Sequence, residues 1–338
     1  MNKMTGQINK ITPEQQTSMW KRILTAVIAI LIIIPSVFLG GWYFFSISIL
    51  FVAFASWELV RSAKKKYNPL LYIFTFILIS FLTYAPLIKN YFSPADGDPY
   101  LFTNFNTLYL SVLIVVVAII LTFSLVLIDK NFEVRDAAYI VTFGIVIGLG
   151  MQSLLFARFY PLNEYYVDTI PHPANNDFFN YFESTYLLFF IAVGALMCDT
   201  GAYFTGLLFG RNKINERISP KKTWEGFAGG AAFSLAFTQS FAFIAAACGT
   251  PIIKSLDLDH WYFIVILGLL ISVISQLGDF IFSSIKRYYS IKDFGFIMPG
   301  HGGILDRIDS VIFASLSSSI LIIIFNFAIS GNWGGLFL

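Results

Sequence analysis

The first apolar stretch of the chain, residues 23–40, reads ILTAVIAILIIIPSVFLG. It contains no charged residue, and an apolar run of about 18 residues or more can cross the roughly 30 Å hydrocarbon core of a bilayer as a helix. The run is too long for the apolar part of a signal peptide, and no small-residue cleavage site follows it. We therefore expect residues 23–40 to form a retained membrane span.

The composition of the whole chain points the same way. Of its 338 residues, 57% are hydrophobic and 12% are charged, whereas soluble domains have about 45–50% apolar and about 25% charged residues. This excludes a soluble enzyme, a disordered chain and a nucleic-acid-binding domain. The two cysteines, Cys198 and Cys248, are too few for a disulfide framework or a cluster of metal ligands. The sequence predicts an all-α, polytopic integral membrane protein.

Eight more apolar segments follow the first, which predicts nine membrane-spanning helices. They are expected at residues 23–40, 42–57, 69–88, 108–128, 137–157, 185–209, 225–248, 261–283 and 309–330. Because Gly40-Gly41 joins the short second segment tightly to the first, we expect these two to form a helical hairpin. We divide the chain into an N-terminal membrane region with five helices and long outer loops, residues 1–184, and a catalytic membrane region with four helices and basic inner loops, residues 185–338.

The basic residues predict how the chain is oriented. With nine spans and the N-terminus inside, all of the 22 Lys and Arg residues except Lys89, Arg158 and Lys254 fall in inner segments. Membrane proteins carry their excess of Lys and Arg on the cytoplasmic side. We therefore predict that the N-terminus lies inside and the C-terminus outside.

Two carboxylates interrupt otherwise apolar spans. Asp199 lies in LMCDTGAY and Asp279 in SQLGD. A charged side chain within a span is costly, about 2.5–3.5 kcal/mol at the centre of a helix, and is a functional candidate by default. A structural carboxylate paired with a neighbouring helix is the alternative for either one alone, but both lie toward the side of the basic loops, which favours a site.

The inner loop after the sixth span contains the sequence SPKKTWEG, residues 219–226. Thr223 is suited to cap the helix that follows, and backbone N–H groups at a helix N-terminus bind anions. Lys221 and Lys222 add point charges that suit a polyphosphate. Contact with lipid headgroups is the alternative interpretation.

The loop before the last span, residues 283–310, holds the densest group of candidate residues. Its turn, PGHGG, contains three glycines that let the backbone approach a ligand closely. Asp306 and Asp309 are spaced so that they share one face of a helix. Paired carboxylates beside a basic, phosphate-binding turn suit Mg²⁺, which prefers one or two carboxylates together with substrate phosphates. For His301, hydrogen bonding to a phosphate or to the turn is favoured over general acid–base catalysis.

These residues resemble the signature of the phosphatidate cytidylyltransferase (CDP-diacylglycerol synthase) family. The resemblance rests on Ser283, Lys286-Arg287, Lys292-Asp293, Pro299, His301-Gly302-Gly303, Asp306-Arg307 and Asp309. The stretches DTGAY at 199–203, SPKKTWEG at 219–226 and SQLGD at 275–279 are also similar to the family and occur in its order. The match covers roughly residues 195–310. Met298 departs from the Leu or similar residue expected before the proline, a conservative packing change.

The resemblance implies the reaction CTP + phosphatidate → CDP-diacylglycerol + pyrophosphate, dependent on Mg²⁺, at the cytoplasmic face. The expected metal ligands, for one metal ion or two, are Asp279, Asp306 and Asp309, with Asp199 and Asp293 as second candidates. The expected catalytic residues are Asp279, Asp306, Asp309, His301 and Lys292. The triphosphate and the lipid phosphate are expected to contact Lys221, Lys222, Lys286, Arg287, Lys292, Arg307, Gly302 and Gly303.

Two other functions remain as alternatives at this point. A CTP-dependent polyprenol or phytol kinase would use similar metal and phosphate ligands but release no pyrophosphate. An ion-coupled transporter would place its charges near the midplane of the membrane, often within inverted repeats. We expect a bacterial inner membrane, with the endoplasmic reticulum as the alternative. The small residues at 226–232 could pack against another helix within the chain or across a homodimer.

Overall fold

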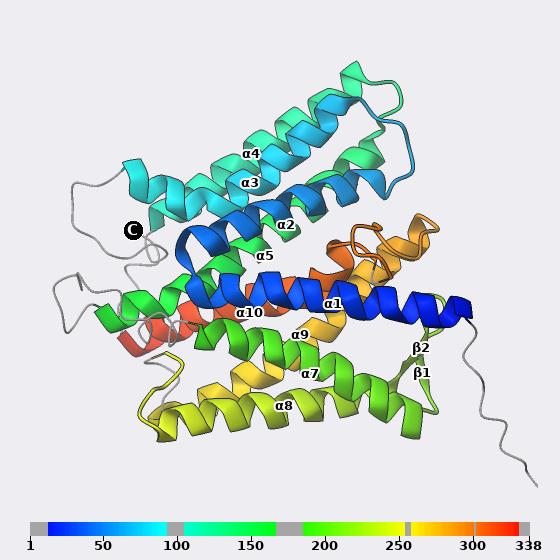
Figure 1. The fold of residues 1–338 in the computed structure, drawn as a ribbon. Coiled ribbons are helices and arrows are strands. Elements are labelled where there is room, and N and C mark those ends of the chain that lie inside the picture. Colours follow the sequence, from blue (N-terminus) through cyan, green and yellow to red (C-terminus); the bar gives the residue numbers. More distant parts are fainter. Residues whose placement is uncertain (1–12, 93–104, 167–184, 254–257, 301, 331–338) are drawn as a thin grey trace, which may run out of the picture.

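The computed structural model describes residues 13–92, 105–166, 185–253, 258–300 and 302–330. In this part of the chain, nine long helices and one two-stranded hairpin make up the fold (Figure 1). The elements are α1 (Pro13–Leu39), α2 (Gly41–Arg61), α3 (Pro69–Phe92), α4 (Phe105–Ile128), α5 (Val134–Tyr166), α7 (Tyr186–Phe209), β1 (Lys213–Asn215), β2 (Ser219–Thr223), α8 (Trp224–Ala247), η2 (Leu258–His260), α9 (Trp261–Tyr288) and α10 (Leu305–Ser330). The prediction of an all-α polytopic membrane protein is confirmed.

Seven of these helices are long and apolar enough to cross a membrane by length and composition: α1, α2, α5, α7, α8, α9 and α10. Within α3 and α4, the apolar stretches of the described residues are shorter, 69–85 and 112–128. The total of nine spans therefore stays a prediction.

The connection between α1 and α2 is as tight as the sequence indicates. Gly40 alone separates the two helices, and it has a φ of 59°, followed by 47° at Gly41. Glycine adopts such positive φ angles without the steric penalty that a side chain adds. The predicted helical hairpin is confirmed.

Helices α7 and α8 pack closely because glycines line their contact. A Cβ atom on Gly226 would lie 2.9 Å from the Ala202 carbonyl oxygen, and one on Gly230 would lie 2.6 Å from that of Cys198. Real Cβ atoms essentially never come within 3.0 Å of other heavy atoms. These two small residues of α8 therefore serve packing within the chain.

The described parts of the loops that the sequence predicts to be inner lie at one end of the bundle, at the right in Figure 1. Thr25, in the middle of α1, donates a hydrogen bond to the Pro299 carbonyl of the loop between α9 and α10, at 3.1 Å. Lys64, after α2, donates to the Ser290 carbonyl at 2.8 Å, and its neighbour Lys65 pairs with Asp136 at the start of α5, at 2.7 Å. This grouping follows from helices that run up and down, and the side of the membrane on which it lies stays a prediction.

The hairpin β1–β2 projects from this end and leads directly into α8. The strands are antiparallel, with Lys213 opposite Thr223 and Asn215 opposite Ser219. The Glu225 carboxylate accepts hydrogen bonds from the backbone N–H groups of Arg211 and Asn212, which ties the base of the hairpin to the first turn of α8. Thr223 accepts from Gly226 N at 3.1 Å, so its prediction as the N-cap of this helix is confirmed.

Candidate functional site

Three carboxylates from three different helices lie close together near the hairpin end. They are Asp199 of α7, Asp279 of α9 and Asp309 of α10, and each of Asp199 and Asp309 interacts electrostatically with Asp279. Ser310 Oγ contacts Asp199 at 3.5 Å, and Ser283 Oγ donates to Asp279 at 3.2 Å. Asp309 is the most enclosed of the three, with 7% of its surface exposed. We call these three residues the carboxylate site.

Asp306 has a different environment, although it shares the signature with Asp309. One of its oxygens accepts from Lys286 Nζ at 2.8 Å, and the other accepts from the backbone N–H groups of Phe294 at 2.8 Å and Gly303 at 3.0 Å. Both oxygens are thus occupied within the chain, and the side chain is 5% exposed. Asp306 therefore holds two points of the loop between α9 and α10, Phe294 and Gly303, beside Lys286 of α9.

Two residues outside the signature also hold this loop, and the sequence analysis did not identify them. Glu58, fully buried at the end of α2, accepts hydrogen bonds from Ile304 N at 3.0 Å and Leu305 N at 2.9 Å. Carboxylates are favourable at a helix N-terminus, where backbone N–H groups lack partners within the helix. Thr25 of α1 contacts the same loop at Pro299. The sequence did offer one signal for Glu58, because it is an ionisable residue at the border of an apolar span.

The glycine turn is only partly described, because His301 lies outside the described residues. Gly302 has a φ of 88° and forms a bridge with Met298. Asp293 lies beside it, since a Cβ atom on Gly302 would be 3.5 Å from the Asp293 side chain. A Cβ atom on Gly303 would collide with the Glu58 carboxylate, which explains why this position is a glycine.

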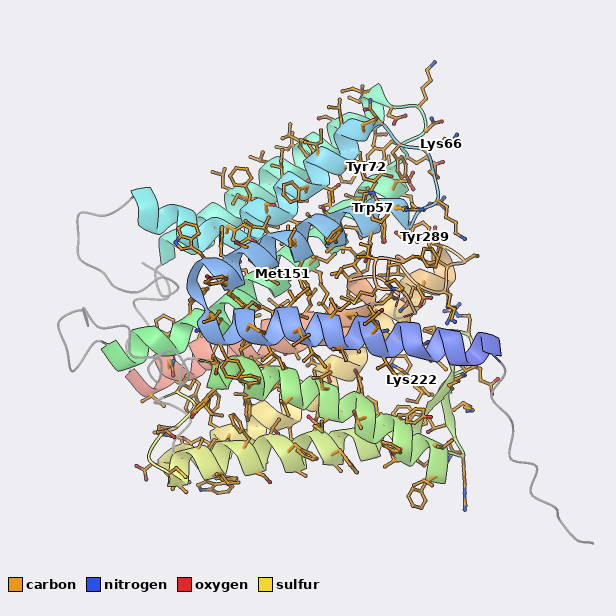
Figure 2. The ribbon with its side chains drawn as sticks, in the orientation of Figure 1. Trp57, Lys66, Tyr72, Met151, Lys222 and Tyr289 are labelled. Carbon is orange, nitrogen blue, oxygen red and sulfur yellow. The ribbon has the colours of Figure 1, made fainter. Side chains whose placement is uncertain are left out.

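The predicted basic residues divide between this site and the surface around it. Lys222 forms an ion pair with Asp279, with 2.5 Å between Nζ and Oδ2, and its position in β2 is visible in Figure 2. Arg307 lies near Asp199, and Lys286 pairs with Asp306. Arg287 donates to the Ile218 carbonyl in the hairpin turn, at 3.1 Å. Lys221 and Lys292 are exposed at the same end of the bundle.

The donor chemistry of the carboxylate site fits a hard divalent cation. Its three negative charges come from three helices, and one of them, on Asp279, is paired with the ammonium group of Lys222. Among the described residues, no group of three or more His, Cys, Asp or Glu side chains has the arrangement of a complete metal site. Mg²⁺ does not need such a group, because it is usually bound through one or two carboxylates, water and substrate phosphates.

A sequence model of the cytidylyltransferase family matches residues 20–325 of this chain, which include every element of the site. The chain belongs to the cytidylyltransferase family. The match begins within α1 and ends within α10, so the family resemblance is not confined to the signature region at 195–310.

Individual relatives agree with this assignment. The phosphatidate cytidylyltransferase of Bacillus subtilis (strain 168) is 31% identical over 295 residues, which covers 87% of this chain and 94% of the relative. Those of Staphylococcus saprophyticus and Staphylococcus haemolyticus are 31% and 30% identical, and each alignment covers 89% of this chain and 98% of the relative.

Proposed function

We propose that this chain is a phosphatidate cytidylyltransferase, which transfers the cytidylyl group of CTP to phosphatidate and releases pyrophosphate. The observation that carries the proposal is the carboxylate site, surrounded by lysines and arginines, in a chain of the cytidylyltransferase family. The names of the bacterial relatives support the same substrates and reaction.

The chemistry of the residues agrees with this reaction. Phosphatidate already carries an ionised phosphate, so its oxygen can attack the α-phosphorus of CTP without a strong general base. Catalysis then requires positioning and neutralisation of charge on the transferring group. Lys222, Lys286 and Arg307 lie beside the carboxylates and would neutralise the phosphates of the two substrates.

A magnesium ion completes the proposal. Asp279 and Asp309, with Asp199 beside them, would hold it, and it would neutralise charge on the triphosphate. Asp306 is a weaker candidate ligand than the signature implies, because both of its oxygens already accept hydrogen bonds within the chain. Its position supports a role in holding the loop, and Asp293, beside Gly302, would act at the same loop.

The membrane setting of the site is part of the proposal. The apolar helices support an integral membrane protein, and the bacterial relatives support the inner membrane. We place the carboxylate site on the cytoplasmic face because the basic loops gather at that end. A homodimer remains a further proposal, and Gly226 and Gly230 would not contribute to it, since they contact α7.

An assay with labelled CTP tests the function. Detergent-purified protein is incubated with phosphatidate and CTP labelled either at the α-phosphate or in cytidine, with Mg²⁺ or with an excess of chelator. We expect both labels in the lipid phase and an equal amount of pyrophosphate, and neither product with the chelator. Transfer of the γ-phosphate to an alcohol would instead indicate a kinase, and solute uptake into sealed vesicles without a covalent product would indicate a transporter. Either result would overturn the proposal.

A further inference from the structure

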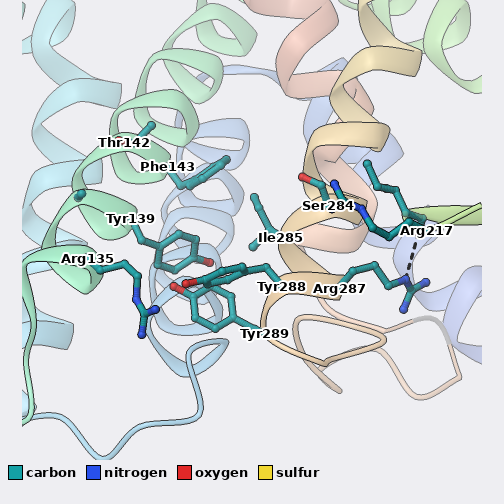
Figure 3. A pocket seen from close by; sticks show the side chains of 12 residues that line it. Arg135, Tyr139, Thr142, Phe143, Arg217, Ser284, Ile285, Arg287, Tyr288 and Tyr289 are labelled. Carbon is teal, nitrogen blue, oxygen red and sulfur yellow. Dashed lines mark hydrogen bonds between the residues drawn. The ribbon is translucent and has the colours of Figure 1, made fainter. Parts of the chain in front are cut away.

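A cavity of about 730 Å³ lies beside the carboxylate site, between α5, α9 and the turn of the hairpin (Figure 3). Helix α5 contributes Arg135, Ala138, Tyr139, Thr142 and Phe143. The end of α9 and the residue after it contribute Ser284, Ile285, Arg287, Tyr288 and Tyr289. The hairpin turn contributes Arg217 and Ile218. None of the carboxylates of the site lines this cavity, so it is a separate space.

The lining changes from charged to apolar along the helices. Arg135 lies in the first turn of α5, and Arg217 and Arg287 lie at the hairpin turn and near the end of α9, so the three guanidinium groups belong to the end of the bundle that carries the basic loops. Further along α5, toward the middle of the membrane, the lining residues are Ala138, Thr142 and Phe143. A lipid with an anionic headgroup has this same order of charge and apolar chain.

The three arginines of the cavity differ in their partners. Arg135 lies 3.6 Å from the carboxylate of Glu133, and both of these side chains are largely exposed to solvent. Arg287 is held by the Ile218 and Ile291 carbonyls, at 3.1 and 3.4 Å. Among the described residues, no carboxylate forms an ion pair with Arg217 or Arg287. Arginine side chains bind phosphate oxygens through paired N–H groups. The cavity therefore offers positive charge to an anion from outside the chain.

The three tyrosines of the cavity complete this chemistry. The Tyr139 and Tyr289 ring centres are 4.9 Å apart, and Arg135 lies 5.8 Å from the Tyr288 ring centre. Burial, followed by the nearby Asp136 carboxylate, raises the pKa of Tyr289 to about 12. A tyrosine hydroxyl is protonated at neutral pH and can donate a hydrogen bond. Tyrosine is typical of membrane interfaces, because its ring is apolar and its hydroxyl is polar.

We propose that this cavity is the docking site of the lipid substrate, a diacylglycerol lipid with a phosphomonoester headgroup. The inference rests on the proposed function and adds where the lipid binds before its phosphate reaches the carboxylate site. Arg287 lies eight residues after Asp279 on α9, which is about 12 Å along a helix. The hairpin links the two spaces, since Lys222 pairs with Asp279 while Ile218 accepts from Arg287.

The first test removes single charges from the rim. In mixed micelles, Arg135→Gln and Arg217→Gln are expected to raise the KM for phosphatidate about tenfold each, because each variant loses a charge-assisted hydrogen bond to the headgroup at a partly hydrated site. The KM for CTP should change less than twofold. Lys130→Gln is the control, since it removes an exposed charge before α5 without touching the cavity.

The second test fills the apolar part of the cavity and leaves its charge unchanged. Ala138→Trp should raise the KM for phosphatidate with long acyl chains more than that for the dioctanoyl form. Val134→Trp, one turn earlier on the same helix and outside the cavity, should not. Thermal unfolding of each purified variant checks that it is folded.

Three outcomes would overturn the inference. An increase in the KM for CTP instead of phosphatidate would make the cavity a nucleotide site. Unchanged constants in both arginine variants would exclude a substrate site there, and an equal effect of Val134→Trp and Ala138→Trp would exclude specific binding of the acyl chains. Failure of the proposed function is distinguishable, because the wild-type protein would then form no CDP-diacylglycerol at all.

Discussion

At the scale of single residues, the carboxylate site joins negative charges that repel one another. Asp199 and Asp309 each interact unfavourably with Asp279. Such a site is less stable than a neutral one, and functional sites commonly cost stability in this way. The chain retains the three carboxylates, which the proposed binding of a metal ion and phosphates explains.

Replacing Asp309 with Asn should lower the activity without lowering the thermal stability. Asp309→Asn removes one negative charge from the carboxylate site, so we expect cytidylyltransferase activity to fall by about 100-fold or more. The thermal midpoint should stay unchanged or rise, because repulsion with Asp279 is relieved. The measurements are product formation from labelled CTP and thermal unfolding in detergent. Activity near that of the wild type would contradict the assignment of Asp309 to the metal.

Asp306→Asn provides the contrast. This substitution weakens the ion pair with Lys286 and the hydrogen bonds from Phe294 N and Gly303 N. Breaking one member of a buried pair costs about 3–5 kcal/mol, because the partner charge stays buried without compensation. We expect a lower thermal midpoint together with lower activity. If the midpoint matched that of the wild type, Asp306 would not be holding the loop.

The contacts of Glu58 lead to a prediction about stability and activity that the signature residues alone do not give. Glu58→Gln replaces one acceptor oxygen by an amide N–H, which would face the N–H of Ile304 or Leu305. A buried donor without a partner costs about 1–3 kcal/mol. We expect a lower thermal midpoint and reduced kcat. The KM for CTP should change little, because Glu58 contacts the loop backbone. Wild-type behaviour in all three measurements would remove Glu58 from the site.

Sequence reasoning identified residues whose type alone is informative. Asp199 and Asp279 stand out because carboxylates are rare in apolar spans, and the structure brings both together with Asp309. Glu58 was missed because the second predicted span ended at residue 57, which made it resemble an ordinary interfacial residue. Arg135 and Arg217 were missed as cavity residues because one lies in the first turn of α5 and the other in the hairpin turn, and only the fold brings both to the same cavity.

At the scale of elements, helix positions followed from apolar length, whereas helix ends did not. Helix α5 extends to Tyr166, beyond the predicted end of its span at residue 157, because helical hydrogen bonding continues into polar residues outside the apolar run. The hairpin β1–β2 was not predicted, since residues 213–223 lack the alternating apolar pattern of strands. It forms where Glu225 binds the backbone of residues 211 and 212.

The contact between α7 and α8 should tolerate no side chain at Gly230. Because a Cβ atom there would lie 2.6 Å from the Cys198 carbonyl oxygen, Gly230→Ala forces the two helices apart. Overpacking costs about 1–3 kcal/mol, so the thermal midpoint should fall, and Asp199 on α7 should move relative to Asp279. Ala228→Leu adds more atoms at an exposed position of the same helix and is the control. Equal midpoints for the two variants would contradict the close packing.

At the scale of the whole molecule, the distribution of charge predicts which end of the bundle faces the cytoplasm. Basic loops gather at the end where the hairpin and the signature loop meet, while α8 runs away from this end toward Cys248. Of the two cysteines, Cys248 is exposed and lies at the opposite end of the bundle, whereas Cys198 is buried.

Thiol labelling in cells tests this orientation directly. A membrane-impermeant maleimide should label Cys248 in cells whose cell envelope has been made permeable to the reagent but whose inner membrane is intact. The reason is that the positive-inside rule places the end of α8 outside the inner membrane. In a Cys248→Ser background, Lys130→Cys lies at the basic end and should be labelled only after the inner membrane is opened. Cys198 should stay unlabelled in both experiments. The reverse pattern would put the carboxylate site on the outer face, where CTP is not supplied, and would contradict both the orientation and the proposed reaction.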